Sequence, residues 1–97
     1  MTAPRDEAAT DRLRRGLVAF RAAQALLLGV HREAKALASL AERERFWASR
    51  GEAVEARQRT AAAEVVAAFK VFSAAGLVAG AADRHLITQA RRHLAED

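Results

Sequence analysis

The sequence predicts an all-α protein: a long antiparallel helical hairpin with either a kink or a short third helix near residues 76–82. Proline occurs once, at Pro4, so no later position breaks a helix by lacking a backbone donor. Apolar side chains recur three, four or seven residues apart over long stretches, which is the spacing of one helix face. Alternation with period two is nowhere sustained, so we expect no strands.

The first arm of the hairpin is a helix expected to begin at Thr10 or Asp11, because either side chain can accept hydrogen bonds from the free amides of a first turn. Residues 1–9 are polar and are expected to form a flexible N-terminus, which leaves residues 10–97 as a single helical domain. The apolar face of this arm repeats at helical spacing and consists of Leu13, Leu17, Phe20, Leu27, Val30, Ala34, Leu37 and Ala41.

The chain is expected to reverse near residue 50. Gly51 can adopt the left-handed conformation that ends a helix, and Ser49 with Glu52 has the spacing of a capping box for the next helix. The second arm then begins near Glu52. Its far end leaves two alternatives, because the small residues of 74–80 allow either a close-packed helical seam or a turn followed by a third helix that Asp83 caps.

A reversal near residue 50 would bring position i of the first arm opposite roughly position 100 minus i of the second. Phe20 would then meet Gly80, and Gly29 would lie opposite Val71 and Phe72, so that large residues fall against small ones. On this basis Gly80→Leu is expected to destabilise the protein by about 1–3 kcal/mol. The residues expected to pack helices or form an interface are Leu17, Phe20, Leu27, Gly29, Trp47, Phe69, Phe72, Gly76 and Gly80.

Motifs for catalysis and metal binding are missing from the sequence. There is no cysteine, and the three histidines, at positions 31, 85 and 93, lack the spacing of a metal site. No serine lies in a nucleophile elbow, and the glycines are too scattered to form a phosphate-binding loop. We therefore expect no catalytic residue, no metal and no cofactor.

In size and outline the chain resembles the helical chorismate mutases, with Arg15, Arg32 and Arg43 at roughly the spacing that this family uses on its first helix. The resemblance implies a domain-interlocked dimer that binds a dicarboxylate. The sequence departs from the family at residues 54–57, which read Val-Glu-Ala-Arg where the family needs an Arg-Glu pair, and at Arg92, which replaces a glutamine. A helical enzyme of this kind is a remote alternative.

The positive charge is carried almost entirely by arginine. The formal net charge is +4, and residues 1–50 contain ten Arg and Lys against six Asp and Glu, whereas residues 51–97 contain six of each kind. An antiparallel hairpin would bring two basic clusters to one end of the molecule, where arginine side chains pair well with phosphates. No base-reading element accompanies them, so nucleic-acid binding is expected to be weak and nonspecific. The patch would consist of Arg12, Arg14, Arg15, Arg21, Arg84, Arg91 and Arg92.

These observations predict a non-enzymatic helical interaction module, such as an adaptor, chaperone, inhibitor or structural component, that acts through self-association and protein binding. A chain of 97 residues builds only a thin core, and Leu26, Leu27 and Leu28 span more than one helix face, so we expect a dimeric helical bundle. The alternative is a small basic nucleic-acid-associated regulator. The excess of arginine and alanine is typical of a GC-rich bacterium or its phage, and the absence of cysteine and of a convincing membrane span favours the cytoplasm.

Overall fold

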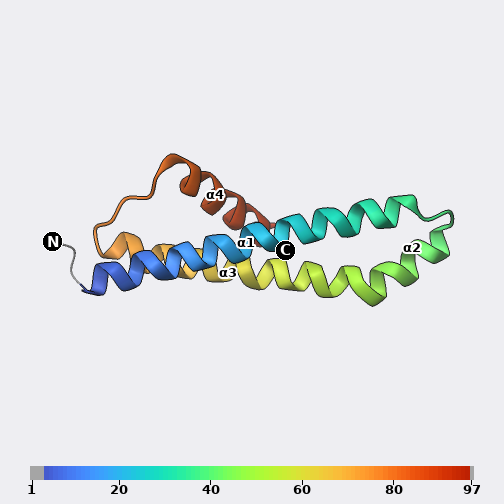
Figure 1. The fold of residues 1–97 in the computed structure, drawn as a ribbon, viewed down its shortest axis with the longest axis horizontal. Helices are drawn as coiled ribbons and strands as arrows, with labels where there is room; N and C mark the ends of the chain where they lie inside the picture. Colours follow the sequence, from blue (N-terminus) through green and yellow to red (C-terminus); the bar gives the residue numbers. More distant parts are fainter. Residues whose placement is uncertain (1–3, 97) are drawn as a thin grey trace.

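The structure is a computed structural model that describes residues 4–96, and every regular element in that range is a helix. Two long helical segments pack against each other along most of an elongated molecule of 58 × 21 × 21 Å, and a third folds back over one end (Figure 1). The all-helical prediction is therefore confirmed. In chain order the elements are α1 (Pro4–Ala36), α2 (Leu40–Phe46), the π-helical turn η1 (Trp47–Gly51), α3 (Glu52–Ala74) and α4 (Ala81–Ala95).

Helix α1 begins at Pro4, six residues before the predicted cap at Thr10. Proline suits a first helical position, and the acidic side chains of Asp6 and Glu7 lie in the first turn, where they face the positive end of the helix dipole. The Thr10 hydroxyl instead donates to the Asp6 carbonyl at 2.8 Å inside the helix. Residues 4–9, expected in a flexible N-terminus, are thus helical; residues 1–3 of that expected segment lie outside the described residues.

The chain reverses at residues 37–39, so the predicted reversal near residue 50 is wrong. Ser39 caps α2, because its Oγ accepts from the Glu42 amide at 3.1 Å while Glu42 Oε2 accepts from the Ala38 amide at 3.3 Å. Arg43 secures the end of α1 by donating through Nε and Nη2 to the Leu37 carbonyl at 3.2 and 3.1 Å. A Ser-x-x-Glu capping sequence does begin a helix, but it is Ser39 to Glu42, ten residues earlier than the predicted Ser49 to Glu52.

The π-helical turn η1 joins α2 to α3 without a reversal (Figure 1). Gly51 has φ −63° and ψ −44°, an ordinary right-handed conformation, so it does not end a helix. The Ser49 hydroxyl donates to the Phe46 carbonyl at 3.0 Å within the helical backbone and caps nothing. Gly51 is required for another reason: a Cβ there would overlap the six-membered ring of Trp47.

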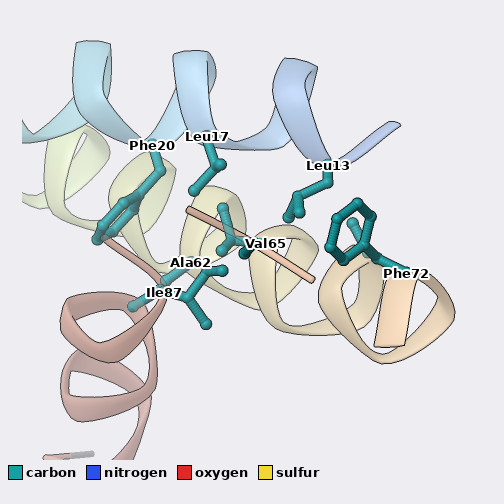
Figure 2. Packing of buried hydrophobic residues seen from close by; sticks show 10 residues of the cluster. Leu13, Leu17, Phe20, Ala62, Val65, Phe72 and Ile87 are labelled. Atoms are coloured by element: carbon teal, nitrogen blue, oxygen red, sulfur yellow. The ribbon is translucent and has the colours of Figure 1, made fainter. Parts of the chain in front are cut away.

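The shared core of α1, α3 and α4 lies at the end of the molecule that α4 covers (Figure 2). Phe20, Val65 and Ile87 are essentially excluded from solvent, one from each of the three helices. Six of the seven buried positions on α1, at 9, 13, 16, 20, 23 and 30, follow alternating steps of four and three when the half-buried position 27 is included, which is a heptad pattern, and Leu17 lies beside this line. The remaining members of the core are Leu13, Leu17, Ala62, Ala68, Phe72, Ala79 and Ala90.

Contacts between the two long segments differ from the predicted pairing. Arg12 bonds Glu64, an ideal Cβ on Gly16 would meet Val65 Cγ2 at 3.6 Å, and the ring of His31 lies beside that of Trp47. The residue numbers in such pairs add up to about 80, because the reversal comes about ten residues earlier than expected. The pairing of position i with 100 minus i is wrong.

The glycines predicted to form a close-packed seam do not form one. A Cβ placed at Gly29, Gly76 or Gly80 would have no neighbour within 4 Å, so Phe20 does not pack on Gly80. Gly76 ends α3 instead: it has φ +80°, its amide donates to the Ser73 carbonyl at 2.9 Å, and the Leu77 amide donates to the Phe72 carbonyl at 3.3 Å. This is a Schellman motif, in which a left-handed residue favours glycine.

A third helix follows this turn, which decides between the two alternatives for residues 76–82. Its N-cap is Gly80, at φ −70° and ψ 167°, and no side chain caps it. Asp83, the predicted cap, lies in the first turn of α4. No helix within residues 4–96 is long and apolar enough to cross a membrane.

Candidate functional site

Helix α4 divides the molecule into two unequal parts. It packs on α3 and on the first part of α1, and its last turns reach Gln24 and Gln58 near the middle of the long helices (Figure 1). Residues 4–24 and 58–95 therefore form a three-helix proximal half. Residues 25–57, which include the reversal and η1, form a two-helix distal half, and every member of the buried core cluster lies outside it.

The distal half exposes large apolar side chains. Leu26, Leu28 and Leu40 are 43%, 52% and 68% exposed, and Val30 is the one large apolar residue of this half that is fully buried. Trp47 is half-buried, with its ring centroid 5.1 Å from that of His31. Two helices alone leave this apolar surface in contact with water, which is a feature of surfaces that bind a partner.

The residues predicted to pack helices have three different environments. Leu17, Phe20 and Phe72 are buried in the proximal core. Leu27, Gly29, Trp47 and Phe69 are half-buried, and Gly76 and Gly80 are exposed in the connection before α4.

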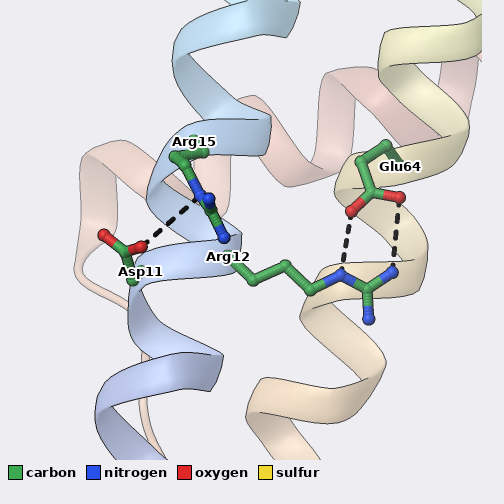
Figure 3. Close-up of polar contacts among 4 residues, drawn as sticks. All are labelled: Asp11, Arg12, Arg15 and Glu64. Atoms are coloured by element: carbon green, nitrogen blue, oxygen red, sulfur yellow. Dashed lines mark hydrogen bonds and ion pairs between the residues drawn. The ribbon is translucent and has the colours of Figure 1, made fainter.

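Two arginines of the predicted basic patch are held in ion pairs, Arg12 with a carboxylate on α3 and Arg15 with one on α1 itself (Figure 3). Arg12 donates through Nε and Nη2 to the two carboxylate oxygens of Glu64 at 2.9 and 3.3 Å, and Arg15 Nε lies 3.4 Å from Asp11 Oδ2. The hydrogen bond from Arg12 lowers the pKa of Glu64 and raises the pKa of Arg12 itself. These two cations are already partly neutralised by the protein.

The other arginines of the patch are divided among separate places. The Arg91 guanidinium lies 5.2 Å from the centroid of the Phe69 ring. Arg14 and Arg21 line a hollow of about 340 Å³, here called the arginine hollow, between α1 and the start of α4. Arg84 is exposed in the first turn of α4, and Arg92 borders a different hollow near its end. The arginine hollow is also lined by Thr10, Leu13, Leu17, Val18, Phe72, Val78, Ala79, Gly80, Asp83 and Leu86.

The arginines suggested by the mutase resemblance are far apart within one chain. Arg15 and Arg32 are seventeen residues apart on α1, which is about 25 Å along the helix. Arg43 is engaged with the Leu37 carbonyl. One chain therefore does not bring these three side chains to a single small dicarboxylate.

A polar cluster that the sequence prediction missed lies where α4 ends against the long helices. Gln58 is 8% exposed and occupies the face of α3 that packs on α1, yet its Oε1 has no hydrogen-bond partner among the described residues. The Nε2 atom of His93 is also buried and also has no hydrogen-bond partner among the described residues. Both residues line a hollow of about 210 Å³, here called the amide hollow, whose other lining residues are Phe20, Gln24, Gln89, Arg92 and Glu96.

Hydrogen bonds connect the remaining polar groups of the amide hollow. Gln24 Nε2 donates to Gln89 Oε1 at 3.1 Å, which ties α1 to α4. Gln89 Nε2 lies 3.2 Å from His85 Nε2, one turn earlier on α4. The sequence signal that could have revealed this site is Gln58, a polar residue at helical spacing between the apolar Val54 and Val65.

No group of three or more His, Cys, Asp and Glu side chains within residues 4–96 is placed to hold a metal ion. Comparisons of the sequence with protein-family models and with curated proteins, and of the structure with solved structures, find no match.

Proposed function

We propose that the protein is a non-enzymatic helical interaction module that self-associates through its distal half and in this form binds other proteins. Adaptor, chaperone, inhibitor and structural roles all share this mode of action. The observation that carries the proposal is the unequal cover of the molecule: α4 covers the buried core of the proximal half, which still exposes Val18, Val71 and Val78, while the distal half has no third helix and no part of that core.

The position of Leu28 makes this argument specific. Gln24 bonds Gln89 of α4, and Leu28 lies one helical turn beyond it on α1. Leu28 therefore continues the side of α1 on which Gln24 meets α4, and the last turn of α4 borders the same hollow as Gln24. Half of its side chain is exposed, so a helix from a second molecule would bury apolar surface there.

Charge favours a second copy of the chain as the partner for this surface. Residues 25–57 contain six Arg and Lys against five Asp and Glu, so two distal halves repel each other little. The rest of the chain carries the remaining basic excess. Two molecules that overlap by their distal halves would form a four-helix bundle and keep the basic proximal halves apart.

Sedimentation equilibrium of the wild type and two matched variants tests this proposal. Leu28→Glu places a charge on the proposed interface, whereas Val18→Glu changes an even more exposed apolar residue of α1 in the proximal half, 65% against 52%. We expect a dimer for the wild type and for Val18→Glu, and dissociation for Leu28→Glu with its helical circular dichroism retained. A monomeric wild type at high micromolar concentration would overturn the proposal.

A second candidate function is weak association with nucleic acid through the arginine hollow. Arg14 and Arg21 are seven residues apart on α1 and hence lie on the same side of it. Neither forms an ion pair with any residue from 4 to 96, unlike Arg12 and Arg15. Both guanidinium groups therefore remain available to phosphate oxygens.

A gel-shift titration with salt tests this second candidate. The complex of the wild type with duplex DNA of arbitrary sequence should weaken steeply between low and moderate salt, since such binding rests on counterion release. The double variant Arg14→Gln/Arg21→Gln should weaken it further, whereas Arg45→Gln on α2 should change it little. Binding that survives physiological salt, or that depends on sequence, would contradict this mode.

A further inference from the structure

All side-chain amides of this protein converge on the amide hollow. The sequence contains three glutamines and no asparagine. Gln24 comes from α1, Gln58 from α3 and Gln89 from α4, and all three line the same hollow. Three separate helices thus contribute the same chemical group to one place.

The hydrogen bonding of this cluster is incomplete on its inner side. Gln24 and Gln89 bond each other, but the buried Gln58 Oε1 and His93 Nε2 have no partner within the described part of the chain. Burying a polar atom without a hydrogen bond is costly, so such atoms are normally satisfied by protein, water or ligand. The hollow of about 210 Å³ is several times larger than the roughly 30 Å³ that one water occupies in the liquid.

We propose that the amide hollow binds a small neutral molecule that presents a primary carboxamide. The carbonyl oxygen of Gln58 accepts a hydrogen bond from the ligand N–H, and the imidazole of His93 donates from Nε2 to the ligand carbonyl. A primary carboxamide carries this donor and this acceptor on one carbon, so a single group supplies both missing partners.

The surrounding side chains favour a small ligand with a short apolar part. Phe20 contributes an apolar wall, while Arg92 and Glu96 stand at the exposed rim on the last turns of α4. Opposite charges at the rim leave little net field inside, which suits a neutral ligand better than a carboxylate or an ammonium ion. Leu28 lies only one turn beyond Gln24, but none of the exposed leucines lines the hollow, so ligand binding does not require self-association.

Propanamide is the probe, and N,N-dimethylpropanamide is its matched control because it keeps the carbonyl but has no N–H. In a nuclear magnetic resonance titration at millimolar concentrations, propanamide should shift the Gln58 side-chain amide and the His93 ring resonances with saturation. The dimethyl compound should bind at least tenfold more weakly.

Two variants separate this site from a purely structural cluster. Gln58→Leu replaces the unpartnered amide by an apolar side chain of similar size, which suits its buried position, and should abolish saturable binding without loss of helicity. Thr60→Val, on the exposed face of α3, should bind as the wild type does. The proposal is overturned if propanamide produces no saturable shift, if both amides act alike, or if Gln58→Leu still binds; the hollow then holds solvent only.

Discussion

Replacing Gly51 by alanine should destabilise the protein, although alanine is the better helix former. Gly51 lies in right-handed helical backbone, so helix propensity alone would make Gly51→Ala stabilising by about 1 kcal/mol. The new Cβ, however, would overlap the ring of Trp47, and even the ring carbon Cζ3 would be only 2.8 Å away. Overpacking costs about 1–3 kcal/mol, and an overlap with a rigid ring belongs at the upper end. The net loss should be about 2 kcal/mol.

Gly29→Ala is the matched control for this substitution. Gly29 also lies inside a helix, but a Cβ there would meet nothing within 4 Å. The propensity gain of about 0.5–1 kcal/mol should therefore appear undiminished. In a domain of this size about 1 kcal/mol corresponds to roughly 4–8 °C in Tm, so the two variants should move Tm in opposite directions.

Thermal unfolding followed by circular dichroism at one fixed protein concentration measures both effects, since self-association would make Tm concentration-dependent. Trp47→Ala completes a double-mutant cycle: without the ring, Gly51→Ala should be neutral or stabilising. If Gly51→Ala raises Tm in the wild-type background as Gly29→Ala does, then the Trp47 ring does not rest on Gly51 and packing does not require glycine in η1.

Three further outcomes follow from the register and the ion pairs. Gly80→Leu should cost no more than about 1 kcal/mol in thermal unfolding, through loss of a favoured N-cap residue, because the site is otherwise open. A larger drop that Phe20→Ala rescues would support the pairing of Phe20 with Gly80, which the structure contradicts. Gly76→Ala should cost about 1 kcal/mol in urea unfolding, because φ is +80° there, and Gly76→Asn should cost less. Glu64→Gln should lower Tm slightly at neutral pH and low salt. Because Arg12 lowers the pKa of Glu64, the ion pair stabilises the fold above the ordinary carboxyl pKa of 4.5, and this stabilisation is lost as the pH falls through the folded-state pKa. A Tm difference between Glu64→Gln and the wild type that persists in strong acid would refute this role of the ion pair.

The sequence was sufficient to predict helices but not the place where they reverse. Ser39 with Glu42 and Ser49 with Glu52 have the same capping-box spacing, so the local motif does not distinguish them. Gly51 favoured the later site, because glycine is the common helix-ending residue. Its actual role is a contact with Trp47, four residues earlier in the chain. A glycine selected for packing and a glycine selected for its backbone conformation look identical in a sequence.

The polar cluster was missed for a related reason. Gln58 lies among charged and small residues, and its burial depends on which face of α3 meets α1. That face is fixed by the register, and the predicted register was displaced by about twenty residues, since the numbers of facing residues add up to about 80 instead of 100. Gln24, Gln58 and Gln89 are 34 and 31 residues apart, so only the correct pairing of all three helices reveals that they meet.

The position of this cluster connects the proposed carboxamide site with the proposed self-association of the distal half. The apolar core of the three helices extends along α1 as far as Phe20, and the glutamines begin one turn later at Gln24. Polar side chains that need hydrogen bonds hold α4 at one defined position, whereas an apolar surface alone would let it slide along the groove. Leu28, one turn beyond Gln24, stays half exposed because the last turn of α4 borders the amide hollow and does not bury it. With few buried apolar side chains of its own, the distal half is the part whose local stability is lowest in a monomer and gains most from a partner. A chain whose α4 continued over Leu28 would bury that side chain within one molecule, and it would lose the surface available to a second copy.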